Sequence, residues 1–125
     1  MRIHCLGGGL VGSFVTRKLV EAGFEVHLWD VTERETTAIF HLEDALEANH
    51  ESADFVVNML PGSLGHQMTS KLKDSNLKIV DLSFSETTPD ILGDVSCSIL
   101  WDVGIAPGLS NMLVSMAARE FGSLD

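Results

Sequence analysis

The sequence is short of cysteine, of basic residues and of long apolar runs, and each shortage argues against a class of protein. Two cysteines cannot form a disulfide framework, and no spacing of cysteine or histidine resembles that of a metal site. Only 8 lysines and arginines stand against 18 acidic residues, whereas nucleic-acid phosphates are bound mainly by basic side chains. No apolar run approaches the roughly 18 residues of a membrane-spanning helix. We therefore expect no metal, no nucleic acid and no membrane among the partners.

The composition that remains is that of one globular domain. The chain has 125 residues, of which 45% are hydrophobic, so it can bury a core but leaves little room for a second domain. Its first residues lead directly into a strand-like pattern, without the layout of a signal peptide, and we expect a cytoplasmic protein. Cys5 lies in an apolar run and is expected to be a small core residue.

The first thirty residues have the pattern strand, glycine turn, helix, strand. Residues 2–6 form a short strand-like run that ends at three glycines. Apolar side chains then recur at helical spacing, and Gly23 closes the segment. A second run covers residues 25–29 and ends in Asp30. This order is the opening of a parallel βαβ unit.

The stretch after Asp30 fits two structures. Residues 38–42 have the composition of a third strand, but only seven residues separate them from Asp30, and a parallel crossover usually takes about a dozen or more. The apolar residues also fit a helix over residues 33–50. We favour a strand with a shortened connection, followed by a helix over residues 43–51.

Strands and helices continue to alternate along the rest of the chain. Further strands are predicted at residues 55–60, 78–82 and 98–102, and a helix between the first two carries Leu64, Met68 and Leu72 on one face. Pro89 is placed to open a short helix, and a last helix runs from about Leu109 to Phe121. The pattern predicts an α/β fold: one domain with an open, mostly parallel sheet of about six strands and helices on both faces.

The glycines that follow the first strand form a phosphate-binding pattern. Gly7, Gly9 and Gly12 make G-x-G-x-x-G between a strand and a helix, which is where a Rossmann-type, doubly wound fold binds a dinucleotide. Gly7 permits the tight turn, Gly9 lets a pyrophosphate approach the backbone, and Gly12 lets the helix pack close to the strand. The free N–H groups around Leu10 and Val11 then face the phosphates. The alternative is a structural glycine turn that binds nothing.

Asp30 follows Gly12 by 18 positions, at the end of the second strand. A carboxylate there accepts hydrogen bonds from the adenosine ribose and repels a 2′-phosphate, at a cost on the order of 4 kcal/mol per unit charge at about 4 Å. The sequence therefore favours NAD over NADP as the cofactor. Arg34 lies close enough in sequence to weaken this preference, and Asp30 is alternatively a plain turn residue.

Three blocks in the second half resemble the N-terminal region of the saccharopine dehydrogenase family. They are residues 53–62 (ADFVVNMLPG), residues 80–85 (VDLSFS) and residues 102–111 (DVGIAPGLSN), of which the last is the most distinctive. Together with the glycine pattern, the resemblance covers nearly the whole chain. It implies an NAD(P)-binding Rossmann domain, residues 1–125, of an oxidoreductase that acts on a C–N bond of an amino acid or polyamine precursor.

The resemblance also suggests which loops contact the cofactor. Leu60 and Pro61 are expected to line it, because ligands of this fold lie beyond the carboxyl ends of the strands. Ser83 and the loop over residues 104–108 are placed to reach the nicotinamide end, although Ser83 equally fits a capping role. His4, His27 and His41 lie on predicted strands and are expected to be half-buried rather than catalytic; we identify no catalytic residue.

The chain departs from the family in two ways. Its second-to-third-strand connection is short, and it stops at Asp125, where relatives continue into a second domain that supplies the substrate pocket and dimer contacts. We therefore expect the catalytic domain to be absent and this chain alone to be catalytically incomplete. The broad apolar face of the last helix predicts a homo-oligomer, or a second domain packed there. Alternatives to the enzyme are a stand-alone nucleotide-sensing module and a degenerate assembly domain.

Overall fold

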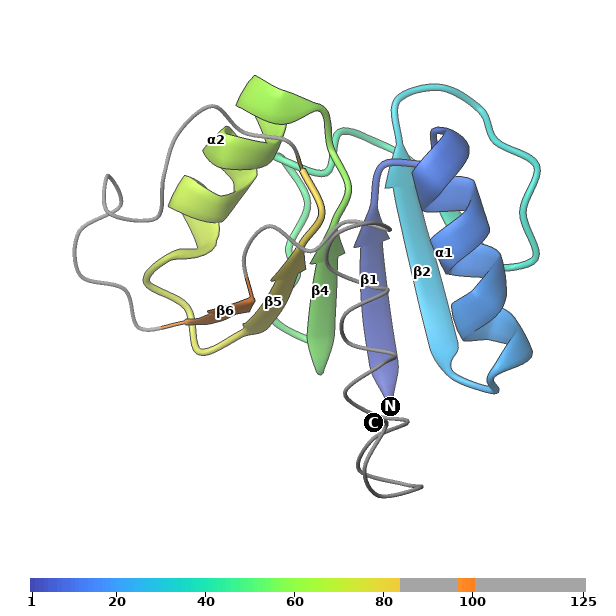
Figure 1. Ribbon diagram of the computed structural model, residues 1–125, viewed down its shortest axis with the longest axis horizontal. Helices are drawn as coiled ribbons and strands as arrows, with labels where there is room; N and C mark the ends of the chain where they lie inside the picture. Colours follow the sequence, from blue (N-terminus) through green and yellow to red (C-terminus); the bar gives the residue numbers. More distant parts are fainter. Residues whose placement is uncertain (84–96, 101–125) are drawn as a thin grey trace, which may run out of the picture.

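A computed structural model describes residues 1–83 and 97–100. Its six strands form one parallel sheet with one described helix on each face (Figure 1). In chain order the elements are β1 Arg2–Leu6, α1 Leu10–Glu21, β2 Glu25–Asp30, β3 Ile39–Leu42, β4 Phe55–Asn58, α2 Gly62–Leu72, β5 Lys78–Asp81 and β6 Ser98–Leu100. The predicted α/β class and Rossmann-type, doubly wound architecture are confirmed.

The six strands lie in the order β3-β2-β1-β4-β5-β6. β1 is central and pairs in parallel with β2 on one side and β4 on the other, so that Cys5 lies opposite both Leu28 and Val57. The chain builds one half of the sheet outward from β1, and then returns to the other side of β1 to build the second half. The carboxyl ends of β1 and β4 therefore flank the point where the strand order reverses, which is where this type of sheet binds ligands.

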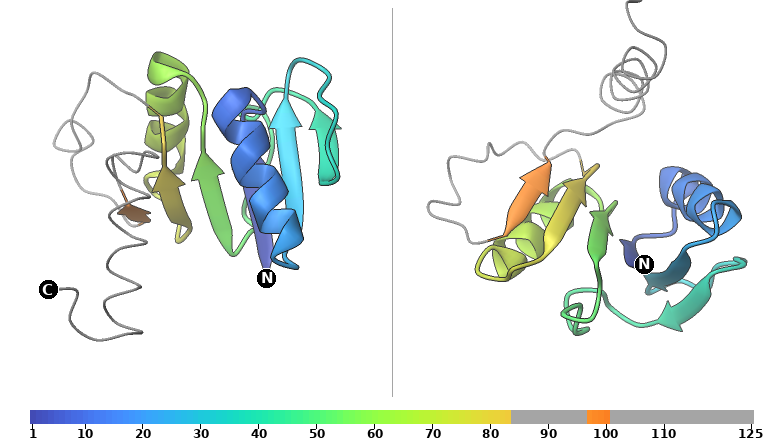
Figure 2. Two further views of the ribbon diagram at one scale, coloured as in Figure 1. Left: turned by 45° about the vertical axis from the view of Figure 1, so that its right-hand side comes forward. Right: turned by 90° about the horizontal axis from the view of Figure 1, so that it is seen from below.

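Alternate residues of the strands supply two separate cores. Cys5 packs with Val26, Leu28 and the apolar side of α1, whereas the next residue, Leu6, packs with Trp29 and with Met68 of α2. Successive side chains of a strand point to opposite faces, so the two helices cover opposite faces of the sheet (Figure 2). The predicted core position of Cys5, which is fully buried, is confirmed.

The region after β2 contains the predicted third strand and not the longer helix. β3 pairs in parallel with β2, and residues 31–38 connect the two strands without a helix. The rings of Trp29 and His41, which lie opposite each other, stack at 4.2 Å with an interplanar angle of 7°. The shortened connection leaves the outer side of α1 without the usual neighbouring helix.

The helix that we predicted over residues 43–51 is wrong. These residues form turns, and their own side chains explain why. The Asp44 carboxylate accepts the N–H of Leu46 at 2.9 Å, and the Asn49 side chain accepts the N–H of Glu51 at 2.8 Å. The Asn49 bond takes up an N–H that a helix would bond to the carbonyl four residues earlier, and local bonds of both kinds are why aspartate and asparagine favour turns.

Several predictions on the second half lie outside the described residues. These are the short helix at Pro89, the last helix and the loop over residues 104–108. Within the ranges that are described, β4 and β5 end two and one residues earlier than predicted, at Asn58 and Asp81. Neither described helix has the length and apolar character needed to cross a membrane.

Candidate functional site

The turn after β1 requires glycine at its first position. Gly7 has a φ of +95°, in the left-handed region that side-chain-bearing residues rarely adopt. A Cβ on Gly7 would also lie 2.8 Å from the carbonyl oxygen of Met59, which follows β4. The turn is tied to β2 by a bond from the Gly7 N–H to the Trp29 carbonyl, at 2.9 Å. Gly7 therefore lets the chain turn sharply between the ends of β2 and β4.

Gly12 and Gly9 have opposite surroundings. A Cβ on Gly12 would lie 2.0 Å from the carbonyl oxygen of Gly7, so α1 approaches the end of β1 more closely than any other residue would allow. A Cβ on Gly9 would meet nothing within 4 Å. Gly12 is thus needed for packing, whereas the space in front of Gly9 is open to a ligand.

The amino end of α1 faces this open space, and no described group accepts the N–H of Leu10 or Val11. The first N–H groups of a helix have no partner within it, which here includes those of Leu10 and Val11. Gly9 is the N-cap residue and no described side chain caps the helix. The Ser13 hydroxyl, one turn along, donates to the Gly8 carbonyl at 2.8 Å. An anion at this position would meet unsatisfied donors and the positive end of the helix dipole.

Asp30 lies beside the glycine loop and is bonded directly to it. Its Oδ2 accepts the N–H of Gly8 at 2.7 Å and the Nε of Arg34 at 3.1 Å, and its Oδ1 accepts the N–H of Thr32 at 2.8 Å. Burial raises the pKa of this carboxyl, but the bonds from Thr32, Gly8 and Arg34 outweigh that effect and hold the pKa below its ordinary value. A carboxylate has about four acceptor positions, so one position on Oδ1 is left for a ligand hydroxyl.

These groups line one cavity of about 440 Å³ at the carboxyl ends of β1, β2 and β4. Its floor is the glycine loop, one side is Asp30 with Thr32 and Arg34, and the opposite side is Met59 to Pro61 with Leu64. Asp44, Ala45 and Leu46, from the turns after β3, close it. The cavity therefore combines Gly9, the N-cap residue of α1, with a hydrogen-bonding carboxylate and apolar walls.

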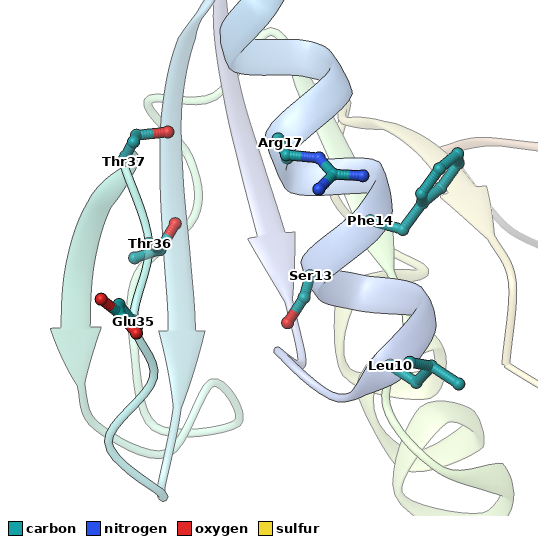
Figure 3. A pocket seen from close by; sticks show the side chains of 7 residues that line it. All are labelled: Leu10, Ser13, Phe14, Arg17, Glu35, Thr36 and Thr37. Atoms are coloured by element: carbon teal, nitrogen blue, oxygen red, sulfur yellow. The ribbon is translucent and has the colours of Figure 1, made fainter.

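A larger groove of about 560 Å³ lies between α1, from Leu10 at its amino end to Arg17, and residues 35–37 (Figure 3). It occupies the place that a crossover helix between β2 and β3 would fill. Its basic group, Arg17, lies over the Phe14 ring at 5.7 Å from the ring centroid. The groove contains neither the glycine turn nor Asp30, so we assign the candidate site to the smaller cavity.

A buried polar network joins the ends of β4, α2 and β5. The Asn58 side chain donates to the Gly65 carbonyl at 2.8 Å, and the Thr69 hydroxyl lies 3.0 Å from Asp81 Oδ2. Asp81 Oδ1 accepts both the N–H and the hydroxyl of Ser83. The sequence analysis missed this network, although polar residues that end two buried strands were a usable signal.

The residues predicted to bind the cofactor fall into two groups. Those that line the cavity are Gly7, Gly9, Asp30, Leu60 and Pro61. Those that do not are Leu10 and Val11, whose side chains are exposed, Gly12, which is buried, and Ser83, whose hydroxyl is bonded to Asp81. The sequence analysis gave no role to Gly8 or Thr32, whose N–H groups orient Asp30.

Four of the five histidines, which are scattered in the sequence, lie together on the face of the sheet that α2 covers. His4, His27 and His41 come from β1, β2 and β3, and His50 follows in the turns. Of the predicted half-buried histidines, His27 and His41 are partly buried, whereas His4 is only 3% exposed. In the described ranges no group of histidine, cysteine and acidic side chains has a metal-binding arrangement.

The fold is shared with solved reductases and dehydrogenases at low sequence identity. An imine reductase variant from Myxococcus stipitatus, in complex with NAD+, aligns with 98% of this chain and 63% of its own, at 16% identity and a TM-score of 0.52. A D-isomer specific 2-hydroxyacid dehydrogenase from Xanthobacter autotrophicus Py2, in complex with NADPH and MES, aligns with 98% of this chain and 68% of its own, at 17% identity and a TM-score of 0.53.

A third similar structure is pyrroline carboxylate reductase from Plasmodium falciparum with NADP bound. It aligns with 66% of this chain and 33% of its own, at 14% identity and a TM-score of 0.53. The chain thus spans one third to about two thirds of the length of these proteins. No protein-family model matches the sequence, and no curated protein matches it significantly. The comparisons show a Rossmann-type fold of the kind found in NAD(P)-dependent reductases.

Proposed function

We propose that this chain is the dinucleotide-binding domain of an NAD(P)-dependent oxidoreductase. The observation that carries the proposal is the bond between Asp30 and the Gly8 N–H beside the open amino end of α1. It brings the Asp30 carboxylate next to the loop that leads into α1, which supports a site for a ribose hydroxyl at Asp30 and for phosphates at the helix end. In a bound dinucleotide the pyrophosphate would lie at Gly9, Leu10 and Val11, and the adenosine ribose at Asp30.

NAD is the favoured cofactor. Asp30 is only 10% exposed and its lowered pKa keeps it ionised at neutral pH, so a 2′-phosphate beside it would meet a like charge. Arg34 partly offsets that repulsion, because it is 37% exposed and can turn toward a phosphate. The preference for NAD over NADP therefore depends on how strongly Asp30 holds Arg34.

The class of substrate follows from the sequence blocks rather than from the cavity. Residues 53–62 and 80–85 resemble the saccharopine dehydrogenase family, and one structural neighbour is named an imine reductase. The sequence blocks support chemistry at a carbon–nitrogen bond, whereas other structural neighbours are named 2-hydroxyacid dehydrogenases. Hydride transfer requires a substrate held against the nicotinamide, so we infer that a further domain or partner chain completes the active site.

Calorimetry with NADH and NADPH at pH 7.5 tests the proposal. We expect saturable heat with NADH, weaker binding of NADPH, and no turnover of amino-acid substrates by this chain alone. The matched variant is Asp30→Asn, which keeps an acceptor for the Gly8 N–H but lacks the charge, and it should bind NADH more weakly than the wild type. The absence of heat with millimolar concentrations of either dinucleotide would remove the proposed function and leave only the fold.

A further inference from the structure

The middle glycine of the loop, Gly8, is packed under the side chain of Arg34. Gly8 is buried, and a Cβ on it would lie 2.9 Å from Arg34 Cγ, 3.2 Å from Asp30 Oδ2 and 3.3 Å from Leu28 Cδ2. Two carbon atoms pack at about 3.5–4.0 Å, so the first of these contacts is a clash. The aliphatic stem of Arg34 therefore occupies the space in which a side chain at position 8 would begin.

The backbone at Gly8 does not itself require glycine. Among the described glycines a positive φ is found at Gly7 and Gly23, and not at Gly8. The Gly8 N–H donates to Asp30 Oδ2 at 2.7 Å, and any residue except proline would supply the same donor. The G-x-G-x-x-G pattern also leaves this position open. What glycine provides here is a seat, which is the space at Gly8 that the Arg34 stem fills.

The seat brings the Arg34 guanidinium to the carboxylate that faces the ligand. Arg34 Nε donates to Asp30 Oδ2 at 3.1 Å, beside the Gly8 bond, and an acceptor position on Oδ1 remains for a ribose hydroxyl. A guanidinium has five N–H donors, so the four on its terminal nitrogens are not used in this bond. Both side chains line the candidate cavity, and Arg34 is partly exposed there. The pair thus offers an acceptor to a hydroxyl and donors to a phosphate.

We propose that Gly8 is a cofactor-specificity residue that acts through Arg34: its seat holds the guanidinium where the terminal N–H groups meet a 2′-phosphate, and so moderates the preference for NAD over NADP. The inference rests on the proposed function and adds a positioning residue to that site. Without the seat, Arg34 would still reach a 2′-phosphate, but binding would have to order a long side chain that the wild type holds in place. Ordering one such side chain weakens binding by about three- to tenfold.

The test is a double-mutant cycle in which calorimetry measures the NADPH-to-NADH affinity ratio, with NADPH measured by competition against NADH. Gly8→Ala should lower the ratio at least about threefold, because the new methyl group displaces the Arg34 stem. Arg34→Met keeps Cγ, and with it the same clash, but has no guanidinium. In that background Gly8→Ala should leave the ratio unchanged. The pressure of the methyl group on Asp30 and Leu28 is common to both backgrounds and cancels in the cycle.

Gly9→Ala is the matched control within the same loop. Its methyl group meets nothing within 4 Å and does not touch Arg34. It should weaken NADH and NADPH alike, because both carry the same pyrophosphate, and so leave their affinity ratio unchanged. A ratio that falls equally in Gly8→Ala and Gly9→Ala would mean that any change in the loop alters specificity, and would overturn the role of the seat.

The seat can also be observed in the chain without a ligand. In NMR spectra recorded in mildly acidic buffer, the Arg34 Nε–H should exchange slowly in the wild type, where it is bonded to Asp30, and rapidly in Gly8→Ala. If Gly8→Ala does not fold by circular dichroism, the wild-type Nε–H signal and Arg34→Met decide. A rapidly exchanging Nε–H in the wild type, or a wild-type affinity ratio in Arg34→Met, would then overturn the proposal.

Failure of this inference and failure of the proposed function give different results. If both dinucleotides bind but Gly8→Ala leaves their ratio unchanged, or changes it equally in the Arg34→Met background, the specificity role of Gly8 is refuted and the dinucleotide site stands. If neither dinucleotide binds the wild type, the proposed function fails and the specificity role fails with it. The Nε–H signal then shows only whether Gly8 seats Arg34.

Discussion

Gly12, in the first turn of α1, and Gly9, its N-cap residue, should respond differently to substitution by alanine: the first should lose stability and the second should lose dinucleotide affinity. In Gly12→Ala the new methyl group would lie 2.0 Å from the Gly7 carbonyl oxygen and 2.8 Å from its carbonyl carbon. Backbone atoms cannot turn aside as a flexible side chain can, so α1 must move outward by more than 1 Å. Overpacking of this kind typically costs about 1–3 kcal/mol, and we expect the upper end because the obstacle is backbone.

Gly9→Ala is the matched partner, because it adds the same methyl group three residues earlier. Nothing lies within 4 Å of it, and the φ of −65° at Gly9 suits alanine. The loss of an N-cap glycine should destabilise the chain by less than about 1 kcal/mol. The methyl group would instead stand where a pyrophosphate approaches, and NADH affinity should fall by at least about tenfold, or 1.4 kcal/mol.

Urea unfolding followed by circular dichroism measures the first effect, and calorimetry with NADH measures the second. We expect a lower midpoint with an unchanged slope for Gly12→Ala, and a near wild-type midpoint with weakened binding for Gly9→Ala. Two results would refute the reasoning. One is equal stability of the two variants, and the other is full NADH affinity in Gly9→Ala.

Three further predictions follow from the described side chains. Asp30→Asn should weaken NADH binding and raise the NADPH-to-NADH affinity ratio at least about tenfold in calorimetry, and an unchanged ratio would mean that the charge does not select the cofactor. With the pKa of His4 lowered to about 4, the folded chain binds fewer protons than the unfolded chain between about pH 6.5 and 4. Stability should therefore fall by about 3 kcal/mol as the pH drops through that window, and urea unfolding of His4→Asn should show a shallower fall. Cys5, whose pKa burial raises to about 11, and Cys97 are both buried, so a thiol reagent at pH 7.5 should label them only after unfolding; rapid native labelling of Cys5 would contradict its core position.

The sequence was sufficient to predict the fold because local patterns and global topology agree. The short buried strands, the positive-φ glycine after β1 and the spacing to Asp30 each indicate a parallel βαβ unit without reference to distant contacts. The floor and one side of the candidate cavity were predictable for the same reason. Gly7, Gly9 and Asp30 lie within the first thirty residues, and Leu60 and Pro61 come soon after the end of β4.

The rest of the site depends on contacts that have no local pattern. The turns over residues 43–53 replaced a predicted helix, because Asp44 and Asn49 bond to nearby backbone N–H groups and His50 bonds to β1. The histidine cluster joins residues up to 46 positions apart, through parallel pairing that brings His4 and His27 into register. Periodicity in a single segment carries no information about such pairs.

The most direct measurement of the central claim is a two-dimensional amide NMR titration of the chain with NADH at pH 7.5. The account predicts the largest shifts at the amides of Gly9, Leu10 and Val11, with a second group at Gly8 and Thr32, whose N–H groups bond to Asp30. Leu10 also lines the larger groove, so the discriminating residues there are Arg17 and residues 35–37, which should change little. Shifts centred on that groove, or saturating binding that leaves the Gly9–Val11 amides unmoved, would contradict the assignment of the dinucleotide to the glycine loop.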